Sequence, residues 1–466
     1  MSQLRNLLCA MSILIFGMVN LHAQNGAQGK NAISGYAGRY FLVGFMQNEL
    51  ILLPGGIRLS ISISTIRPTS LRVAAPISGP SLYYQIPGDT VIELTFNYTD
   101  VEVYDSERPL MRAIELESDQ PITVSGMSSQ SLSTDGYSAI PVAKWGREYV
   151  VHSWPNDIYM HDDDPQGKIP RSSEFMVIAS ENNTAIEFTP RSRTLGKIQP
   201  GTSTIITLNK GQCYLVKSDT LPAGSGDLSG TIVRSDKPIG VFSGHLRTAI
   251  PIGLQEFDSK NHLTEMLYPT EQWGKTFITL PFTNDGMGDF FRFHCIEPNT
   301  TVTVKGWNVN QTHVLTNPGD FKTLTFMRDP LLIESDKPIS IAQYMTSSFS
   351  SNERLQTFDP CMMLIPSVDK CITKASFHVV NNPSTNPKQF SKHFISLVCT
   401  DDAVDHVMLD NRLVKTIVSN LPNQRVNGTQ FFYATIPVTP GAHQLSTMEG
   451  SFNAGLYGTG SDDAYA

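Results

Sequence analysis

The sequence predicts an all-β protein made of four tandem quasi-repeated β-sandwich-like units. Alternating apolar and polar runs of five to eight residues recur at roughly ten-residue spacing, and almost nothing has helical period. A short phrase, Ser-Asp-x-Pro followed by an apolar run, occurs at residues 117–124, 234–241 and 334–341. Such repetition indicates serial β-rich units. A closed, propeller-like ring of the four units is the alternative arrangement.

The repeated phrase has a local physical explanation. Serine and aspartate favour a turn because their short polar side chains bond the nearby backbone. Proline fixes its own φ and pushes the preceding residue into an extended conformation. We therefore expect a strand, a polar turn and a second strand at each copy, with Pro121, Pro238 and Pro338 in equivalent places.

Residues 1–23 have the features of a secretory signal peptide. Arg5 supplies a positive start, residues 7–19 are mostly apolar, and residues 21–23 form a plausible cleavage site. This apolar run is short for a membrane span, and we expect no membrane span in the mature chain. The polar, glycine-rich residues 24–38 are expected to be a linker. The protein is therefore predicted to be secreted and to act outside the cell or at a cell surface.

The rest of the chain divides into the four predicted units. A joining segment follows each copy of the phrase and combines an apolar-proline step with an aromatic-containing strand. Trp145 and Trp273 occupy equivalent positions in two of these segments, so we interpret them as buried anchors. The predicted units span residues 39–130, 131–262, 263–356 and 357–466.

Composition and cysteine content limit the class of protein. The chain has 40% hydrophobic and 17% charged residues, which is typical of folded globular proteins. Its net charge of -8 and the lack of a long basic run argue against a nucleic-acid partner. Loss of Cys9 with the signal leaves five cysteines, so at least one thiol is unpaired within the chain. Cys361 and Cys371 are the candidate disulfide in an oxidising compartment, and buried free thiols are the alternative.

Several motifs occur in the order found in a known protein family. They are Thr134-Asp135-Gly136, Ser235-Asp236-Lys237-Pro238, Trp273-Gly274-Lys275-Thr276-Phe277, Ser335-Asp336-Lys337-Pro338 and the closing Tyr457-Gly458. Over residues 131–460 the chain resembles the N-terminal domain of the IgGFc-binding protein family, in a bacterial-type secreted form. The resemblance implies an extracellular binding or adhesion module that is not an enzyme. The family has no agreed catalytic residues to transfer to this chain.

The search for catalytic and metal-binding motifs yields one acidic cluster. We find no nucleophile elbow, phosphate-binding loop or His-Glu-x-x-His motif, and we predict no catalytic residue, metal or cofactor. The cluster consists of His161, Asp162, Asp163 and Asp164. Its oxygen atoms would suit calcium, but the spacing is not that of an EF-hand, and a solvated loop is the preferred interpretation.

We predict that binding uses loops rather than the repeated phrases, because function concentrates on loops held by a rigid framework. The largest insertion, residues 156–173, mixes aromatic and charged side chains, and Trp307 lies in a second candidate loop. The expected partner is a protein or glycan at a cell surface or in an extracellular matrix. A structural envelope or matrix protein and a carbohydrate-active enzyme with a cleft between β units are the alternatives. The candidate binding residues are Tyr159, His161, Asp162, Asp163, Asp164, Lys168, Arg171 and Trp307.

Overall fold

Strands make up almost all of the regular structure of this protein. Among the described residues the two α-helices, α1 (Tyr98–Val101) and α2 (Val414–Ile417), have only four residues each, which confirms the all-β prediction. No helix within the described ranges is long and apolar enough to cross a membrane. The computed structural model describes residues 22–23, 36–49, 56–75, 79–130, 132–158, 170–254, 259–284, 287–348, 358–381, 390–426, 428–460 and 463–466.

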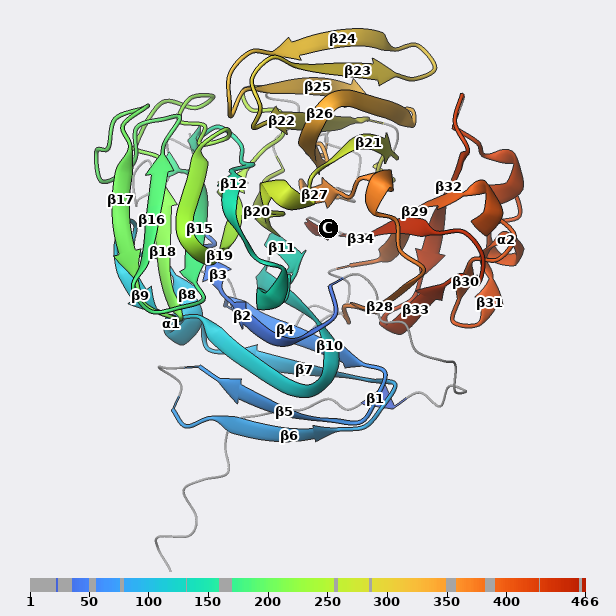
Figure 1. Ribbon diagram of the computed structural model, residues 1–466, viewed down its shortest axis with the longest axis horizontal. Coiled ribbons are helices and arrows are strands. Elements are labelled where there is room, and N and C mark those ends of the chain that lie inside the picture. The colour runs from blue at the N-terminus through green and yellow to red at the C-terminus, as the bar shows by residue number, and fades with distance from the viewer. Residues whose placement is uncertain are drawn as a thin grey trace, which may run out of the picture.

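Three large curled sheets follow one another along the chain, with eight, eight and seven strands (Figure 1). The first sheet contains β1 (His22–Ala23), β2 (Gly38–Val43), β4 (Arg58–Thr65), β5 (Thr69–Ala74), β6 (Leu82–Ile86), β7 (Thr90–Phe96), β10 (Ile114–Gln130) and β11 (Ser133–Ser138). The second contains β9 (Pro109–Met111), β12 (Gly146–Val150), β15 (Ser173–Ala179), β16 (Thr184–Thr189), β17 (Thr204–Leu208), β18 (Gln212–Lys217), β19 (Ile232–Thr248) and β20 (Asn261–Met266). The third contains β21 (Gly274–Thr279), β22 (Asp289–Cys295), β23 (Thr300–Lys305), β24 (Asn310–Leu315), β25 (Phe321–Met327), β26 (Leu331–Tyr344) and β27 (Met362–Ile365).

The C-terminal part has two four-stranded sheets instead of one large sheet. One is formed by β28 (Lys374–Val379), β30 (Met408–Leu409), β31 (Arg412–Leu413) and β33 (Gly441–Ser446), and the other by β29 (Lys392–Thr400), β32 (Phe431–Val438), β34 (Phe452–Gly460) and β35 (Asp463–Tyr465). Two small pairs join β3 (Phe45–Met46) with β8 (Glu102–Val103) and β13 (Asp157–Ile158) with β14 (Pro170–Arg171). Short 3₁₀ helices are η1 (Val142–Lys144), η2 (Thr270–Gln272), η3 (Val368–Lys370), η4 (Asp401–Ala403) and η5 (Leu421–Asn423).

Each large sheet is organised around one long strand that carries the repeated phrase. These strands, β10, β19 and β26, have 17, 17 and 14 residues. The prediction of two strands separated by a turn is therefore wrong. The N-terminal half of each long strand pairs with β2, β12 or β21, and the C-terminal half pairs with β4, β15 or β22. A register shift falls at the phrase on the first of these pairings in all three sheets.

A single side-chain bond explains how the phrase bends the strand without ending it. The serine hydroxyl donates to the carbonyl oxygen two residues later, at 2.8 Å in Ser118, 2.6 Å in Ser235 and 2.7 Å in Ser335. Such local bonds compete with the strand ladder and shift its register. The three copies thus occupy equivalent places, as predicted, although their local conformation is a bulge rather than a turn.

Strand pairing also crosses the predicted unit boundaries. The strand β11 lies after the boundary at 130/131 yet pairs with β10, and β27 lies in the predicted unit 357–466 yet pairs with β26 of the third sheet. Conversely, β9 lies in the predicted unit 39–130 and pairs with β18 of the second sheet. The sheets therefore exchange strands with their neighbours, and the count of four repeats stays a prediction.

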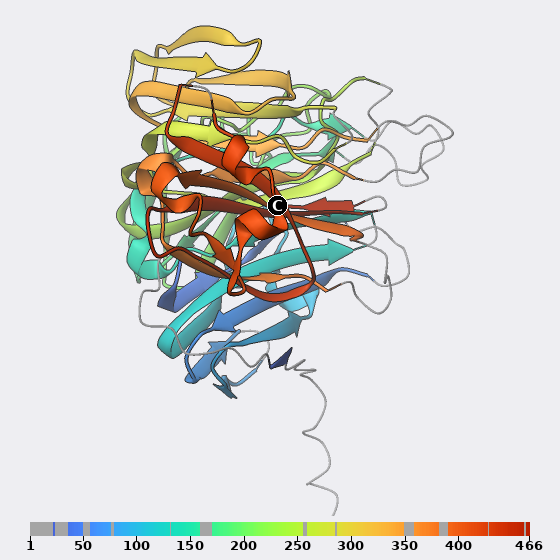
Figure 2. The same cartoon turned by 90° about the vertical axis from the view of Figure 1, so that its right-hand side faces the viewer.

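The sheets close into a ring rather than forming an open row. Figure 1 shows them around the C-terminus, and Figure 2 shows the first and third sheets on opposite sides of the C-terminal sheets. Closure between the two ends of the chain is direct, because His378 Nδ1 on β28 lies 2.9 Å from Ser62 Oγ on β4. Thr123 Oγ1 on β10 donates to the carbonyl oxygen of Ser376 at 3.3 Å. Ring closure of this kind agrees with the alternative predicted arrangement.

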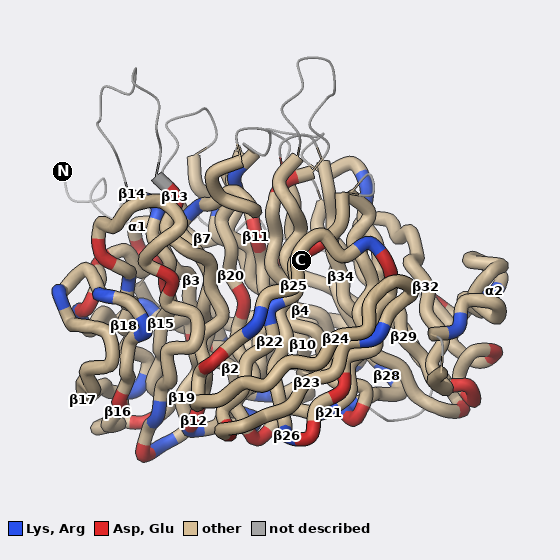
Figure 3. The backbone as a smooth tube through the Cα atoms, turned by 90° about the horizontal axis from the view of Figure 1, so that it is seen from above, with Lys and Arg blue, Asp and Glu red and all other residues tan. Residues whose placement is uncertain are grey.

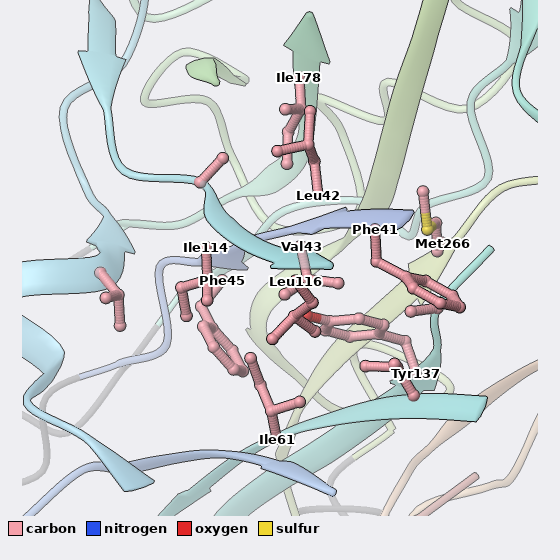
Figure 4. Close-up of a cluster of buried hydrophobic side chains, with 14 of the residues drawn as sticks. Phe41, Leu42, Val43, Phe45, Ile61, Ile114, Leu116, Tyr137, Ile178 and Met266 are labelled. Atoms are coloured by element: carbon pink, nitrogen blue, oxygen red, sulfur yellow. The ribbon is translucent and has the colours of Figure 1, made fainter. Parts of the chain in front are cut away.

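The hydrophobic cores continue from one sheet into the next. Figure 4 shows Phe41, Ile61 and Tyr137 of the first sheet packed with Ile178 and Met266 of the second. The joints confirm the two predicted tryptophan anchors: the Nε1 atoms of Trp145 and Trp273 donate to backbone carbonyl oxygens five residues earlier, at 2.9 and 3.2 Å. Both tryptophan side chains are buried.

Candidate functional site

The predicted binding insertion is anchored by buried residues at its C-terminal end. Tyr159, His161, Asp162, Asp163, Asp164 and Lys168 lie outside the described residues. Arg171, in contrast, is 2% exposed, and its Nε and Nη2 atoms each donate to a carboxylate oxygen of Glu49 at 2.9 Å. Arg171 thus contributes two of its guanidinium N–H groups to an internal ion pair, and its role as a contact residue stays a prediction.

Arg171 belongs to a group of five charged residues, whose other members are Glu49, Asp157, Arg247 and Lys260. Arg247 Nη1 lies 3.0 Å from Glu49 Oε2, and Lys260 Nζ lies 2.5 Å from Asp157 Oδ2. Burial alone would raise the pKa of Glu49, but the hydrogen bonds and charges of Arg171 and Arg247 hold it below its usual value. The group joins the segment after β3 and the β13–β14 pair to the β19–β20 part of the second sheet, and it serves as a structural base for the insertion.

Trp307 lies where the sequence places an exposed aromatic residue. It follows β23 and precedes β24, and 77% of it is exposed. On the adjacent edge strand β24, Val314 is 61% exposed. Tryptophan is rarely left in water without a packing partner and is enriched at the centres of protein interfaces. Figure 3 shows acidic and basic residues interspersed over the described backbone, without separation by sign.

The two cysteines of the candidate disulfide are separate in the structure, as in the stated alternative of free thiols. Cys361 and Cys371 are both free thiols. Cys361 is fully buried in the core shared by the third sheet and β34, whereas Cys371 is only half-buried. Burial raises the pKa of the Cys371 thiol to about 11, so it is predominantly protonated at neutral pH.

A cavity of about 610 Å³ lies at the centre of the ring, and we call it the central cavity. All sheets contribute to its wall, and three exposed residues, Ser138, Lys144 and Lys370, line it and connect it to solvent. Tyr36 and Tyr268 stack within it with their ring centroids 5.7 Å apart. Lys144 Nζ lies 5.7 Å from the centroid of the Tyr36 ring. The cavity thus combines aromatic, hydroxyl and charged groups, as small-molecule sites do.

Two buried acidic residues that are not among the predicted binding residues, Asp135 and Glu265, lie next to the central cavity. Asp135 Oδ1 accepts hydrogen bonds from the backbone N–H groups of Gly136 and Ala466, at 2.9 and 3.1 Å. Its Oδ2 accepts from the backbone N–H groups of Thr264 and Met362, at 3.1 and 3.3 Å. Asp135 therefore ties together β11, β20, β27 and the end of the described chain.

Glu265 lines the central cavity itself. Its Oε1 accepts from the backbone N–H of Leu364 at 3.3 Å. Burial, with a smaller contribution from the nearby Asp135, raises the pKa of Glu265 well above its usual value. In the sequence, Glu265 is recognisable only as an acidic residue inside an apolar strand pattern, Leu263-Thr264-Glu265-Met266. No group of three or more potential metal ligands occurs among the residues that the structure describes.

Comparison with known proteins gives two findings. A family model described as "IgGFc binding protein" matches residues 135–458. The human protein named "IgGFc-binding protein" is 23% identical over 423 residues, which cover 89% of this chain. The matched region is 7% of the length of the human protein. The match of the family model covers more than half of this chain and all of its second and third sheets except β9.

Proposed function

Because this chain belongs to the IgGFc-binding protein family, we propose that it is an extracellular protein-binding module that acts without catalysis. The observation that carries the proposal is Trp307, a largely exposed tryptophan at the tip of the β23–β24 hairpin. Its side chain is not part of any of the hydrophobic cores within the described ranges. Val314, which is exposed opposite Thr301 toward the other end of the same hairpin, adds a second apolar side chain to the hairpin surface.

The hydrogen bonds of Asp135 support a role for this residue without catalysis. A carboxylate pair that acts as acid and base must leave oxygen atoms free for a substrate. Both oxygens of Asp135 are instead occupied by backbone N–H groups from four separate segments. Asp135 is therefore suited to holding the ring together and not to transferring protons to a ligand.

The predicted insertion remains part of the proposed contact surface, but its boundaries need correction. Asn156 is buried, and its side-chain amide donates to the carbonyl oxygen of Asp219 at 2.8 Å. Ser173 begins a fully buried strand. Deletion of 156–173 would therefore unfold part of the second sheet. Replacement of 159–169 by a short glycine-serine turn is compatible with the fold, because Ile158 and Pro170 are paired across β13 and β14.

Binding of residues 24–466 to immobilised immunoglobulin G Fc, measured by biolayer interferometry with Fab as the control, is the first test. The name of the human relative makes Fc the first partner to examine. We expect saturable binding to Fc, weaker binding after replacement of 159–169, and an unchanged melting temperature. Absence of Fc binding would reject Fc as the partner. Absence of binding to every member of an array of extracellular proteins would reject the proposed function.

A further inference from the structure

One wall of the central cavity is a continuous patch of hydroxyl groups. Ser62 and Ser64 on β4 lie directly across from Ser125 and Thr123 on β10. Ser125 in turn pairs with Ser138 on β11. All five residues line the cavity, and Ser62 and Ser64 alternate along β4 with the core residues Leu59, Ile61 and Ile63. The polar face of β4 is therefore turned toward the ring centre.

The remaining wall is aromatic and aliphatic. Trp273, Met363 and Leu456 line it from the third sheet and β34, and the stacked pair Tyr36 and Tyr268 forms one side. Hydroxyl groups on one wall and flat apolar surfaces on the other match the chemistry of a sugar ring, which presents hydroxyls at its edge and C–H groups on its face. The volume of about 610 Å³ also falls in the range of small-molecule sites, about 300–1,000 Å³.

Two polar side chains at the cavity, those of Ser376 and Glu265, are placed to form hydrogen bonds with a ligand. The Oγ of Ser376 is buried and has no hydrogen-bond partner among the described residues. A buried hydroxyl without a hydrogen bond lowers stability unless a ligand or water bonds it. Glu265 lines the same cavity, and burial raises the pKa of its carboxyl group well above the usual value, which favours the form that donates to an acceptor oxygen. Both groups suit hydroxyl-bearing ligands that donate and accept together.

From this arrangement we propose that the central cavity binds a carbohydrate, as a monosaccharide or the terminal disaccharide of a glycan, with the Ser62–Ser64–Thr123–Ser125–Ser138 wall bonding its hydroxyls and the Tyr36–Tyr268 pair covering its apolar face. This site is separate from the Trp307 hairpin, so it goes beyond the proposed protein binding. A negative result for Fc leaves the carbohydrate proposal standing, and the reverse also holds.

The test is saturation-transfer difference NMR of residues 24–466 with the methyl glycosides of glucose, galactose, mannose, N-acetylglucosamine and N-acetylneuraminic acid. Ser138→Trp places a large side chain in the mouth of the cavity, at an exposed position that disturbs no core. Thr312→Trp is the matched control, because Thr312 is exposed on the edge strand β24 and is not a cavity residue.

We expect saturation transfer to at least one glycoside, its loss in Ser138→Trp and its retention in Thr312→Trp. Ser125→Ala, which removes one wall hydroxyl, is expected to weaken binding by about fivefold, the effect of one hydrogen bond. Unchanged melting temperatures show that the variants remain folded. The proposal is overturned if none of the five glycosides receives saturation, or if Ser138→Trp and Thr312→Trp behave alike.

Discussion

At the scale of single residues, Asp135 is the group on which the centre of the ring depends most. It is fully buried, and its four N–H donors come from residues that are up to 331 positions away in the sequence. No local pattern in the sequence predicts such distant partners. Thr134-Asp135-Gly136 is therefore recognisable in the sequence only as a family motif. Aspartate can accept hydrogen bonds at both side-chain oxygens, whereas the asparagine amide can accept at only one atom.

Asp135→Asn should therefore destabilise the protein strongly. The asparagine amide places an NH₂ group against two backbone N–H donors, and we expect a loss of about 3 kcal/mol in the free energy of unfolding. Urea denaturation measures this loss. Asp402→Asn, at an exposed position in η4, is the control and should change stability by less than about 0.5 kcal/mol. Equal stability of the two variants would show that Asp135 does not hold the ring.

A second residue-scale feature is a buried histidine pair between the second and third sheets. The rings of His152 and His294 lie 4.1 Å apart, and His152 Nε2 is 3.0 Å from Ser340 Oγ. Burial and the neighbouring Arg292 lower the pKa of His152 to about 3, and burial with His152 lowers the pKa of His294 well below its usual value. Neither ring nitrogen of His294 has a hydrogen-bond partner among the described residues.

His294→Phe should make stability less dependent on pH. Unfolded histidine binds a proton below about pH 6.5 while folded His294 stays neutral, so stability falls on acidification by about 1.4 kcal/mol per pH unit. Phenylalanine keeps an aromatic ring at this position, and no hydrogen bond is lost because neither ring nitrogen of His294 has a partner among the described residues. Thermal melts between pH 7 and 5 should show a shallower decline in melting temperature for His294→Phe than for the unmodified chain. An unchanged slope in His294→Phe would contradict the buried neutral histidine.

At the scale of elements, the sequence predicted the strands well and their connections less well. The positions of the three phrases and of the anchors Trp145 and Trp273 follow from local composition, and both are confirmed. The continuity of β10, β19 and β26 through the phrase depends on pairing with strands far away in the chain, which local turn propensity cannot reveal. Propensity therefore predicted a turn where tertiary pairing produces a bulge.

The candidate site was predictable only in part for the same reason. Exposure of Trp307 follows from its place in a short polar hairpin loop, which is a local property. The burial of Arg171 requires Glu49, which is 122 residues earlier in the chain. The central cavity requires all sheets together, so neither its hydroxyl wall nor Glu265 could be assigned from the sequence.

The bulge at the repeated phrase predicts equal effects in the two copies that share Ser-Asp-Lys-Pro, residues 234–241 and 334–341. Ser235→Ala and Ser335→Ala each remove the bond from serine to the carbonyl oxygen two residues later, and each should cost about 1 kcal/mol of folding stability. Chemical denaturation of the two variants should give similar losses. Ser203→Ala, at an exposed serine bonded to Glu187, is the control and should have little effect. Losses that differ widely between the two phrase serines would contradict their equivalence.

At the scale of the whole molecule, the shared cores predict that the ring unfolds as one unit. The core of the second sheet includes Phe290 and Tyr344 of the third, and the core of the third includes Tyr457 of β34. No sheet can therefore lose its structure without exposing apolar side chains of its neighbour.

Two probes of the same urea titration test this prediction. All four tryptophans lie between residues 145 and 307, so their fluorescence reports on the second and third sheets and their joints, whereas circular dichroism reports on every strand. We expect coincident transitions, as for a two-state protein. A separate transition seen only by circular dichroism would indicate that the first or the C-terminal sheets unfold independently.

The central claim is that this member of the IgGFc-binding protein family binds a protein partner through its exposed hairpin. The most direct test compares Trp307→Ser with Tyr83→Ser, because Trp307 and Tyr83 are 77% and 74% exposed and lie in different sheets. Binding to the partner identified by interferometry should weaken at least about tenfold in Trp307→Ser, as at interface hot spots, and stay unchanged in Tyr83→Ser. Equal affinity of both variants and the unmodified chain would contradict the account.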